Sequence, residues 1–420
     1  MAQLTDDCFA FGGRLIPLEE ALQAAAALFK PIEHPETIAL TDALGRIAAT
    51  TVLAPRAVPP HDNAAVDGYA VRHADLKASG GETVLPLSGY AAAGDQPAVL
   101  PKGTARRILT GAAMPPGSDT VFMDEDVQVQ GDQVHLPAGL RLGANARKAG
   151  EDIARGAEIL APGRRLVAAD LGTLASVGLR QVDVQRRLRV ALFSTGNEIR
   201  EPGDPLDPGQ VYDANRQTLR GLLQEAGAEV LDLGILPDQP DAIEAAFVQA
   251  QASQVDMIIT SGGVSAGDHD VVRMVLDARG ELLFWRLAVK PGRPLALGHF
   301  EQTPLIGLPG NPAAAAVMFY VAALPLLRAR EGALPRVPYR IPVALDFSHR
   351  KKADRVEYVR VQVSADDQGK LIARKFAREG AGLLSSIAWA DGLIALEPDR
   401  LRVEPGEMGW FTAFNWSMSA

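Results

Sequence analysis

A short buried strand that leads into a glycine-rich loop is the feature that most restricts how this chain can fold. Val255–Thr260 is an apolar, β-branched run, which is typical of a strand buried on both faces. It is followed by the small residues of Ser261–Gly267, by Asp268 and Asp270, and then by an apolar-periodic helix. A strand, a glycine loop and a helix N-terminus together form the anion-binding arrangement of α/β proteins, because the backbone N–H groups there can approach a phosphate closely.

This loop departs from the known phosphate-binding motifs. The spacing from Gly262 to Gly267 is similar to part of a P-loop, but Asp268 stands where the lysine of that motif belongs. Carboxylates beside a phosphate site are explained if a divalent metal ion lies between them and the anion. The alternative is a tight strand–helix turn in which Asp270 caps the helix. The loop alone leaves both interpretations open.

Strands and helices alternate from Arg189 to Leu327, and this alternation predicts a doubly wound, mostly parallel sheet. Ligands of such sheets bind at the carboxyl ends of the strands, so the polar turns that follow strands should share one rim. These turns are Ser194–Glu198, Asp238, Ser261–Asp270, Lys290–Arg293 and Pro309–Pro312. Taken alone, Asp238 could instead be the N-cap of a helix that begins at Pro240.

The rest of the chain has two other textures. Residues 17–29, 40–52 and 168–178 carry helical patterns, whereas 55–148 holds short apolar runs between Gly/Pro clusters, typical of a compact β module. Those runs are 84–87, 98–100, 105–109, 120–123 and 134–136. After a linker at 331–340, strand patterns recur at 355–363, 371–376 and 392–396. We therefore expect an α/β multidomain protein with a helical or mixed domain (1–54 and 149–187), an inserted β-rich module (55–148), the doubly wound domain (188–331) and a small C-terminal all-β domain (332–420).

Composition restricts the partners and the compartment. A net charge of −9 argues against broad attraction to nucleic acid or anionic lipid. The single Cys8 excludes an internal disulfide framework and a multi-cysteine metal site. The start MAQLTDD lacks the basic region of a signal peptide, and the apolar run Ala313–Leu327 is shorter than the roughly 20 residues that span a bilayer. These features predict a soluble cytoplasmic protein that contacts neither nucleic acid nor membrane.

Seven motifs, in order along the chain, resemble the MoeA/gephyrin family of molybdopterin molybdenumtransferases. They are DNAAVDGYA (62–70), ILTGA (108–112), GEDI (150–153), FSTGNE (193–198), TSGGVSAGDHD (260–270), VKPGRP (289–294) and GLPGNP (307–312). The resemblance implies a homodimer of four-domain subunits in molybdenum cofactor biosynthesis. It also implies that molybdate is inserted into adenylylated molybdopterin, with Mg²⁺ as a cofactor that assists the release of AMP.

The resemblance also implies site residues. The expected catalytic residues are Asp67, Thr110, Asp152, Glu198, Asp238 and Asp270, and three of them, Glu198, Asp238 and Asp270, are the expected metal ligands. The expected binding residues are Ser194, Gly196, Gly262, Gly263, Ser265, Lys290, Arg293, Pro309, Pro312, Arg147 and Arg286. Two positions depart from the family's pattern. The family often has Asp where this chain has Asn197, so one carboxylate fewer is present here. The family commonly has Lys where this chain has Arg286, and the Arg alters phosphate geometry.

Several questions stay open at this point. Asp67, Thr110 and Asp152 lie in segments remote in sequence from the rim, and we expect them to complete the site from the second subunit. For each of these motifs, turn chemistry or a solvated surface run is the alternative. The protein that adenylylates molybdopterin is the expected upstream partner. Rival functions are that adenylylation itself, or a scaffold that binds a partner peptide, as in the gephyrin branch. The choice between molybdate and tungstate as the substrate also stays open, because the two oxyanions are similar in size and charge.

Overall fold

The computed structural model describes residues 15–78, 80–264 and 271–414, which form two compact units. Unit 1 comprises Met1–Glu36, Gly45–Ile47 and Gln185–Ala420, and unit 2 comprises Thr37–Leu44 and Ala48–Val184. The boundaries expected between four domains stay a prediction.

Unit 1 is built on a six-stranded sheet whose order is β16-β13-β17-β21-β20-β18. The strands are β13 (Arg189–Thr195), β16 (Glu229–Leu236), β17 (Met257–Ser261), β18 (Gly280–Arg286), β20 (Pro294–Phe300) and β21 (Thr303–Leu308). The pairs β16–β13, β13–β17 and β17–β21 are parallel, whereas β20 and β18 add an antiparallel edge. All five residues of β17 are buried, as its continuous apolar run predicts.

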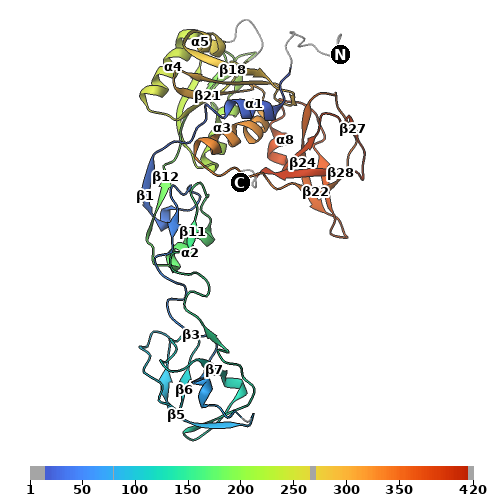
Figure 1. Cartoon of the computed structure of the whole chain (residues 1–420). Helices are drawn as coiled ribbons and strands as arrows, with labels where there is room; N and C mark the ends of the chain where they lie inside the picture. Colours follow the sequence, from blue (N-terminus) through green and yellow to red (C-terminus); the bar gives the residue numbers. More distant parts are fainter. Residues whose placement is uncertain (1–14, 79, 265–270, 415–420) are drawn as a thin grey trace. The chain divides into compact units, whose positions relative to one another are not determined.

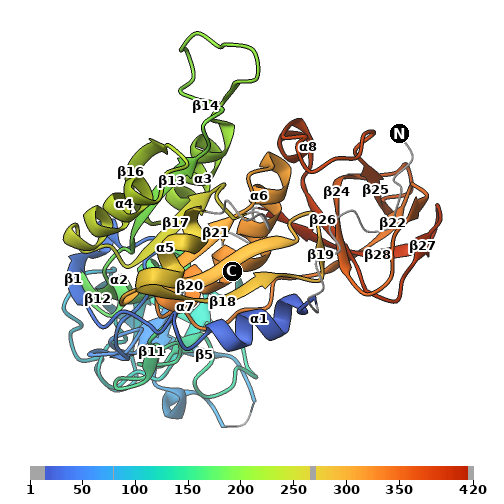
Figure 2. The same ribbon diagram turned by 90° about the horizontal axis from the view of Figure 1, so that it is seen from above.

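Helices cover both faces of this sheet, so it is doubly wound. The helices α4 (Pro240–Ala252) and α5 (Val271–Arg279) pack on one face, and α1 (Leu18–Ala25) and α3 (Ala214–Glu225) pack on the other (Figures 1 and 2). Two short strands, β14 (Ile199–Arg200) and β15 (Val211–Tyr212), bracket the loop between β13 and α3. The parallel strands β16, β13, β17 and β21 all end at the same edge of the sheet, which is the edge where the predicted rim lies.

The long apolar run after Pro312 forms a helix that contains a break. It consists of α6 (Pro312–Met318), a π-helical turn (Phe319–Ala323) and α7 (Leu324–Arg330). Pro325 has no N–H to donate to the preceding turn, and its ring crowds the carbonyl four residues earlier, which explains the widened turn before it. By length and composition this run could cross a membrane, but 72% of its apolar window is buried inside the protein, as in a core helix.

The C-terminal part of unit 1 is a small closed barrel. Its strands are β22 (Ile341–Leu345), β24 (Val356–Ala365), β25 (Leu371–Lys375), β26 (Gly392–Leu396) and β28 (Met408–Ala413). The pairing β24-β25-β22-β28-β26 returns from β26 to β24, so no edge of the ring is left open. The short elements β23 (His349–Arg350), α8 (Ser385–Trp389) and β27 (Arg402–Val403) lie in the connections. One more strand, β19 (Val289–Lys290), joins β24 and links this barrel to the rim.

Unit 2 contains the predicted β module. Its six-stranded sheet, β7-β4-β6-β5-β9-β8, consists of β4 (Gly68–Val71), β5 (Thr83–Ala91), β6 (Ala105–Ile108), β7 (Thr120–Met123), β8 (Gln128–Gln130) and β9 (Gln133–Leu136). Two-stranded pairs come from β1 (Pro35–Ala39) with β12 (Gln181–Gln185), β2 (Val52–Leu53) with β11 (Glu158–Leu160), and β3 (Asn63–Ala64) with β10 (Ala146–Arg147). The helical pieces are α2 (Ala168–Ser176) and the 3-10 turns Leu40–Asp42, His73–Asp75 and Asp124–Asp126.

Two predictions for unit 2 are wrong. Within residues 40–52 only a single 3-10 turn forms, and the longer helix that was predicted is absent. Gly45 adopts a positive φ of 73°, and Ala48 then bridges to Val184 as extended chain. The predicted strand at 98–100 is absent from the described structure, since prolines at 97 and 101 remove the donors that a strand needs. The described residues within 37–54 and 149–184 are therefore mixed in structure, with only a minor helical share.

Candidate active site

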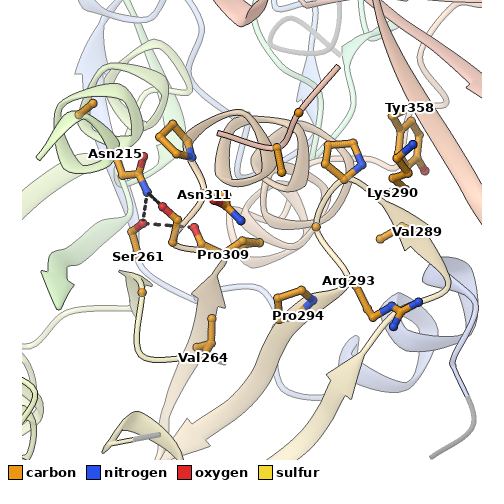
Figure 3. Close-up of a pocket in the computed structure, with 18 of the residues that line it drawn as sticks. Asn215, Ser261, Val264, Val289, Lys290, Arg293, Pro294, Pro309, Asn311 and Tyr358 are labelled. Atoms are coloured by element: carbon orange, nitrogen blue, oxygen red, sulfur yellow. Dashed lines mark hydrogen bonds between the residues drawn. The ribbon is translucent and has the colours of Figure 1, made fainter. Parts of the chain in front are cut away.

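The predicted rim forms one large cavity in unit 1. Its volume is about 1360 Å³, and all five polar turns contribute lining residues. The predicted site residues that line the cavity from these turns are Ser194, Gly196, Glu198, Asp238, Gly262, Gly263, Lys290, Arg293, Pro309 and Pro312. Arg286, at the end of β18, lines the cavity as well. Figure 3 shows the side chains of Ser261, Pro309, Lys290 and Arg293 around this space. The convergence expected from the strand ends is confirmed, whereas the role of each residue stays a prediction.

Glycine is required after β17 by a close approach of two backbones. A Cβ on Gly262 would lie 2.4 Å from the carbonyl oxygen of Thr195, and a Cβ on Gly263 would lie 2.7 Å from the Thr195 Cγ2. Both glycines also have positive φ, of 88° and 66°. The N–H of Gly262 donates to the carbonyl of Leu308 at 3.2 Å, so this N–H is engaged within the fold and is not the free phosphate donor that the sequence suggested.

Asp238 is directed toward the loop after β13. One carboxylate oxygen accepts from the Thr195 hydroxyl at 2.6 Å, and the other accepts from the Asn197 N–H at 3.3 Å. The Asn197 side-chain oxygen in turn accepts from the Asp238 N–H at 3.2 Å. The N-cap of α4 is Gln239, without a side-chain cap, so the interpretation of Asp238 as a helix cap is wrong. Asn197 departs from the family's usual Asp, but it still ties these two turns together.

A buried ion-pair network includes Asp213, which lines the cavity. The guanidinium of Arg216, 5% exposed, binds Asp213 at 3.1 Å, Asp232 at 2.7 Å and the carboxylate of Glu201. Asp213 also caps α3 by accepting from the Arg216 N–H. The Ser194 hydroxyl, predicted to bind ligand, donates to Asp213 at 3.1 Å and is buried. The Ser194 hydroxyl is therefore a hydrogen-bonded member of this buried network.

Asn215 is a lining residue that sequence reasoning missed. Its amide donates to the Ser261 hydroxyl at 2.7 Å and to the Gly310 carbonyl at 2.8 Å (Figure 3). Ser261 also donates to the Pro309 carbonyl at 3.4 Å. These bonds fasten the turn after β17 to the turn after β21. The only signal in the sequence was the position of Asn215 in the first turn of a helix that starts at the rim.

The barrel contributes charged residues to the cavity that the sequence did not indicate. The Lys290 ammonium, 41% exposed, lies 2.8 Å from a carboxylate oxygen of Glu357, which is almost completely buried. The same oxygen lies 2.9 Å from Nε2 of buried His349. Lys375 is 2.8 Å from Glu379, and both also line the cavity. Lys290 is therefore a cation at the rim, as predicted, but it has a carboxylate partner.

The remaining predicted residues all lie in unit 2. Asp67 accepts from the N–H and the hydroxyl of Thr110, both at 2.7 Å, and these bonds lower the pKa of Asp67 below its usual 3.8. Arg147 pairs in register with Asn63, while the Asp152 N–H donates to the Val58 carbonyl. All four residues are exposed. Asp67 thus contacts Thr110, a residue far from it in sequence, and none of the four lines the cavity of unit 1.

Glu198 and Asp238 are the expected metal ligands that the structure describes, while Asp270 and Ser265 lie outside the described residues. Both described carboxylates are exposed at the cavity. In the part of the chain that the structure describes, no group of three or more His, Cys, Asp and Glu side chains is close enough to hold a metal ion. One or two carboxylates with substrate phosphate and water are nevertheless the usual ligands of Mg²⁺, and the donor set fits that ion.

The comparisons with known proteins cover nearly the whole chain. Residues 16–178 match the MoeA N-terminal region (domain I and II), 191–329 a probable molybdopterin binding domain, and 342–408 the MoeA C-terminal region (domain IV). The molybdopterin molybdenumtransferase of Haemophilus influenzae is 37% identical over 399 residues, covering 94% of this chain and 98% of that protein. Its counterpart in Bacillus subtilis is 32% identical over 393 residues, covering 91% and 90%.

Solved structures agree with this assignment. The molybdopterin biosynthesis moeA protein from Pyrococcus horikoshii OT3 superposes with a TM-score of 0.82 at 26% identity, covering 96% of this chain and 100% of that one. The family matches, the relatives and the fold all point the same way: the chain belongs to the MoeA family of molybdopterin molybdenumtransferases.

Proposed function

We propose that this transferase acts in molybdenum cofactor biosynthesis by inserting molybdate into adenylylated molybdopterin, with release of AMP. The observation that carries the proposal is the convergence of five strand-end turns on one cavity, where cations and carboxylates lie together. A cavity of about 1360 Å³ is large enough for a pterin joined to a nucleotide through a pyrophosphate. The family membership and the names of the relatives support the same reaction.

The charged lining supports recognition of a pyrophosphate. Lys290, Arg293 and Arg286 can donate hydrogen bonds to phosphate oxygens, and Arg can do so in a bidentate manner. Release of AMP breaks one P–O bond of the pyrophosphate link as water forms a new P–O bond, and it places negative charge on the departing phosphate. Cations fixed at the rim would stabilise that charge as it develops.

We also propose that Glu198 and Asp238 hold Mg²⁺ together with substrate phosphate. When bound, this ion supplies further neutralisation of the pyrophosphate charge. The Thr195 hydroxyl and the Asn197 N–H orient Asp238 for this task, because each occupies one of its two oxygens. Each carboxylate oxygen has further lone pairs, so these bonds leave room for a metal ion.

The test is incubation of the purified protein with adenylylated molybdopterin, Mg²⁺ and either molybdate or tungstate, followed by measurement of AMP. The proposal expects AMP in amounts stoichiometric with the oxyanion inserted, and no AMP when Mg²⁺ is removed by a chelator. The two oxyanion arms show which anion is preferred. Absence of AMP with both oxyanions would refute the proposed reaction. Formation of adenylylated molybdopterin from ATP would instead support the rival adenylylation activity.

We further propose that the chain acts as a homodimer in which Asp67, Thr110 and Asp152 complete the site of the second subunit. The support is that each of these residues is exposed in unit 2, while the cavity of unit 1 takes its lining from unit 1 alone. We also propose that the protein that adenylylates molybdopterin delivers the substrate.

Mixing two inactive variants tests the shared site. An Asp67→Ala chain combined with an Asp238→Ala chain should regain about a quarter of wild-type AMP release, because random pairing makes half of the dimers mixed and each mixed dimer keeps one intact site. Each variant assayed alone is the control. Mixed dimers, verified by differential tags, that show no recovered activity would contradict sharing.

A further inference from the structure

Lys290 is attached to the barrel through a buried carboxylate. The strand β19 pairs in parallel with β24, and the register places Lys290 directly beside Glu357. The Lys290 ammonium and a Glu357 oxygen are 2.8 Å apart. The Lys290 side chain is 41% exposed and the Glu357 side chain only 5%, so the ammonium lies at the cavity and its partner lies in the wall behind it.

Glu357 is also held in place by a second hydrogen-bond donor, the His349 ring. Its Oε1 lies 2.9 Å from Nε2 of His349, whose side chain is 3% exposed. Nδ1 of that ring lies 3.3 Å from the Lys375 ammonium and 3.4 Å from a Glu379 oxygen. Burial tends to raise the pKa of Glu357, but the hydrogen bonds from His349 and Lys290 outweigh burial, and the pKa stays below its usual 4.5. Glu357 therefore remains ionised at neutral pH.

We infer that Glu357 is a positioning residue that fixes the Lys290 ammonium for oxyanion binding. This inference rests on the proposed function, in which the rim receives phosphate or molybdate. A lysine ammonium has three N–H donors, and one directed to Glu357 leaves two for the anion. A lysine on a flexible four-carbon chain loses much rotational freedom when it binds, and a fixed lysine has already lost it.

The geometry also allows the effect of the Glu357 charge to be separated from the effect of its hydrogen bonds. Both donors meet at Oε1, and Oε2 is buried without a hydrogen-bond partner in the described structure. In Glu357→Gln, the amide oxygen can keep both bonds at Oε1 while the amide nitrogen takes the unused place. Glu357→Ala removes the anchor altogether. A positioning role therefore predicts that Gln retains oxyanion binding and that Ala does not.

The experiment is a double-mutant cycle on Lys290 and Glu357. We expect Glu357→Ala to raise the KM for molybdate roughly 10-fold, with kcat at saturating molybdate changed by less than about threefold. Glu357→Gln should stay within about threefold of wild type in both constants. In the Lys290→Ala background, Glu357→Ala should add no further increase in KM, because the anchor then has nothing to hold. Asp346→Asn, which removes a barrel carboxylate paired with Arg374 at 3.3 Å outside the cavity, is the matched control.

A binding measurement separates this inference from the proposed reaction. Calorimetric titration of molybdate alone into the wild type and the same variants needs no AMP release, so the order of affinities can be obtained even if the reaction is not observed. A parallel weakening by Ala and Gln, or additive effects of Glu357→Ala and Lys290→Ala, would overturn the positioning role. So would a loss confined to kcat that is accompanied by a lower melting temperature, since that pattern indicates a structural role.

Discussion

Replacement of Arg216 by alanine is expected to lower the free energy of unfolding by about 3–5 kcal/mol, the typical cost of removing one partner from a buried ion pair. The guanidinium is 5% exposed and is shared by Asp213, Asp232 and Glu201. Without it, Asp213 would be left almost fully buried with its charge uncompensated. The measurement is denaturant unfolding followed by tryptophan fluorescence or circular dichroism.

Arg220→Ala is the matched control, because Arg220 lies on the same helix and approaches the same Asp232 at 3.8 Å but is 47% exposed. An exposed ion pair contributes about 1 kcal/mol or less, so the control should unfold nearly as the wild type does. Equal losses in the two variants would contradict the account of a buried network. Activity should fall with Arg216→Ala as well, since Asp213 positions Ser194 at the rim.

The pH dependence of stability should also change in the Arg216 variant. Burial tends to raise the pKa of Asp232, but hydrogen bonds from Arg216 and from the Gly234 N–H outweigh burial and lower it below the usual 3.8. A depressed pKa stabilises the fold above that value, and this stabilisation is lost as the pH falls through the folded-state pKa. In Arg216→Ala the hydrogen bonds from Arg216 that lower this pKa are gone and burial dominates, so Asp232 no longer stabilises the fold at neutral pH; the stability difference between wild type and variant should therefore shrink as the pH falls through the folded-state pKa of Asp232 in the wild type.

Replacement of Gly262 by alanine is expected to cost about 2–4 kcal/mol of stability and most of the activity. The new Cβ would lie 2.4 Å from the Thr195 carbonyl oxygen, a backbone atom that cannot rotate away, and the φ of 88° adds strain. Relief requires β17 and β13 to separate at their ends. That movement would displace Gly196 and Glu198, which follow Thr195 on the rim.

Gly209→Ala isolates the contact from the backbone strain. Its φ of 92° is close to that of Gly262, but a Cβ there meets nothing within 4 Å. We expect this control to cost only about 1 kcal/mol, from the left-handed conformation alone, with activity retained. Equal melting temperatures and equal AMP release by the two variants would show that the approach of the Thr195 carbonyl has no importance.

The strand ends could be predicted because the periodicity of apolar residues and the residue preferences of turns depend only on residues close together in the sequence. The buried run before Gly262 and the polar turns after each strand set the sheet and its rim, and the rule for open α/β sheets then brings the turns together. The prediction for residues 40–52 failed at one glycine. Helical periodicity carried no information about the positive φ of Gly45, nor about the bridge of Ala48 with Val184.

The contribution of the barrel could not be predicted because it depends on register between distant strands. Nothing local to Glu357 indicates that β24 will pair with β19 and place that carboxylate against Lys290. The roles of Asp238 and Gly262 show the same limit. The sequence does not indicate that Asp238 accepts hydrogen bonds from Thr195 and Asn197, or that the Gly262 N–H donates to the Leu308 carbonyl.

The central claim is that the rim of unit 1 holds metal and phosphate during AMP release, and Asp238→Asn tests it most directly. Asn keeps an oxygen that can accept from Thr195 but loses the charge that binds Mg²⁺. The measurement is the rate of AMP release across a series of Mg²⁺ concentrations, with Asp241→Asn, an exposed residue in the first turn of α4, as the control. The account predicts a rate on the order of 100-fold lower at low Mg²⁺, partly restored at high Mg²⁺, for Asp238→Asn alone. Equal rates and equal Mg²⁺ dependence in wild type, Asp238→Asn and Asp241→Asn would contradict it.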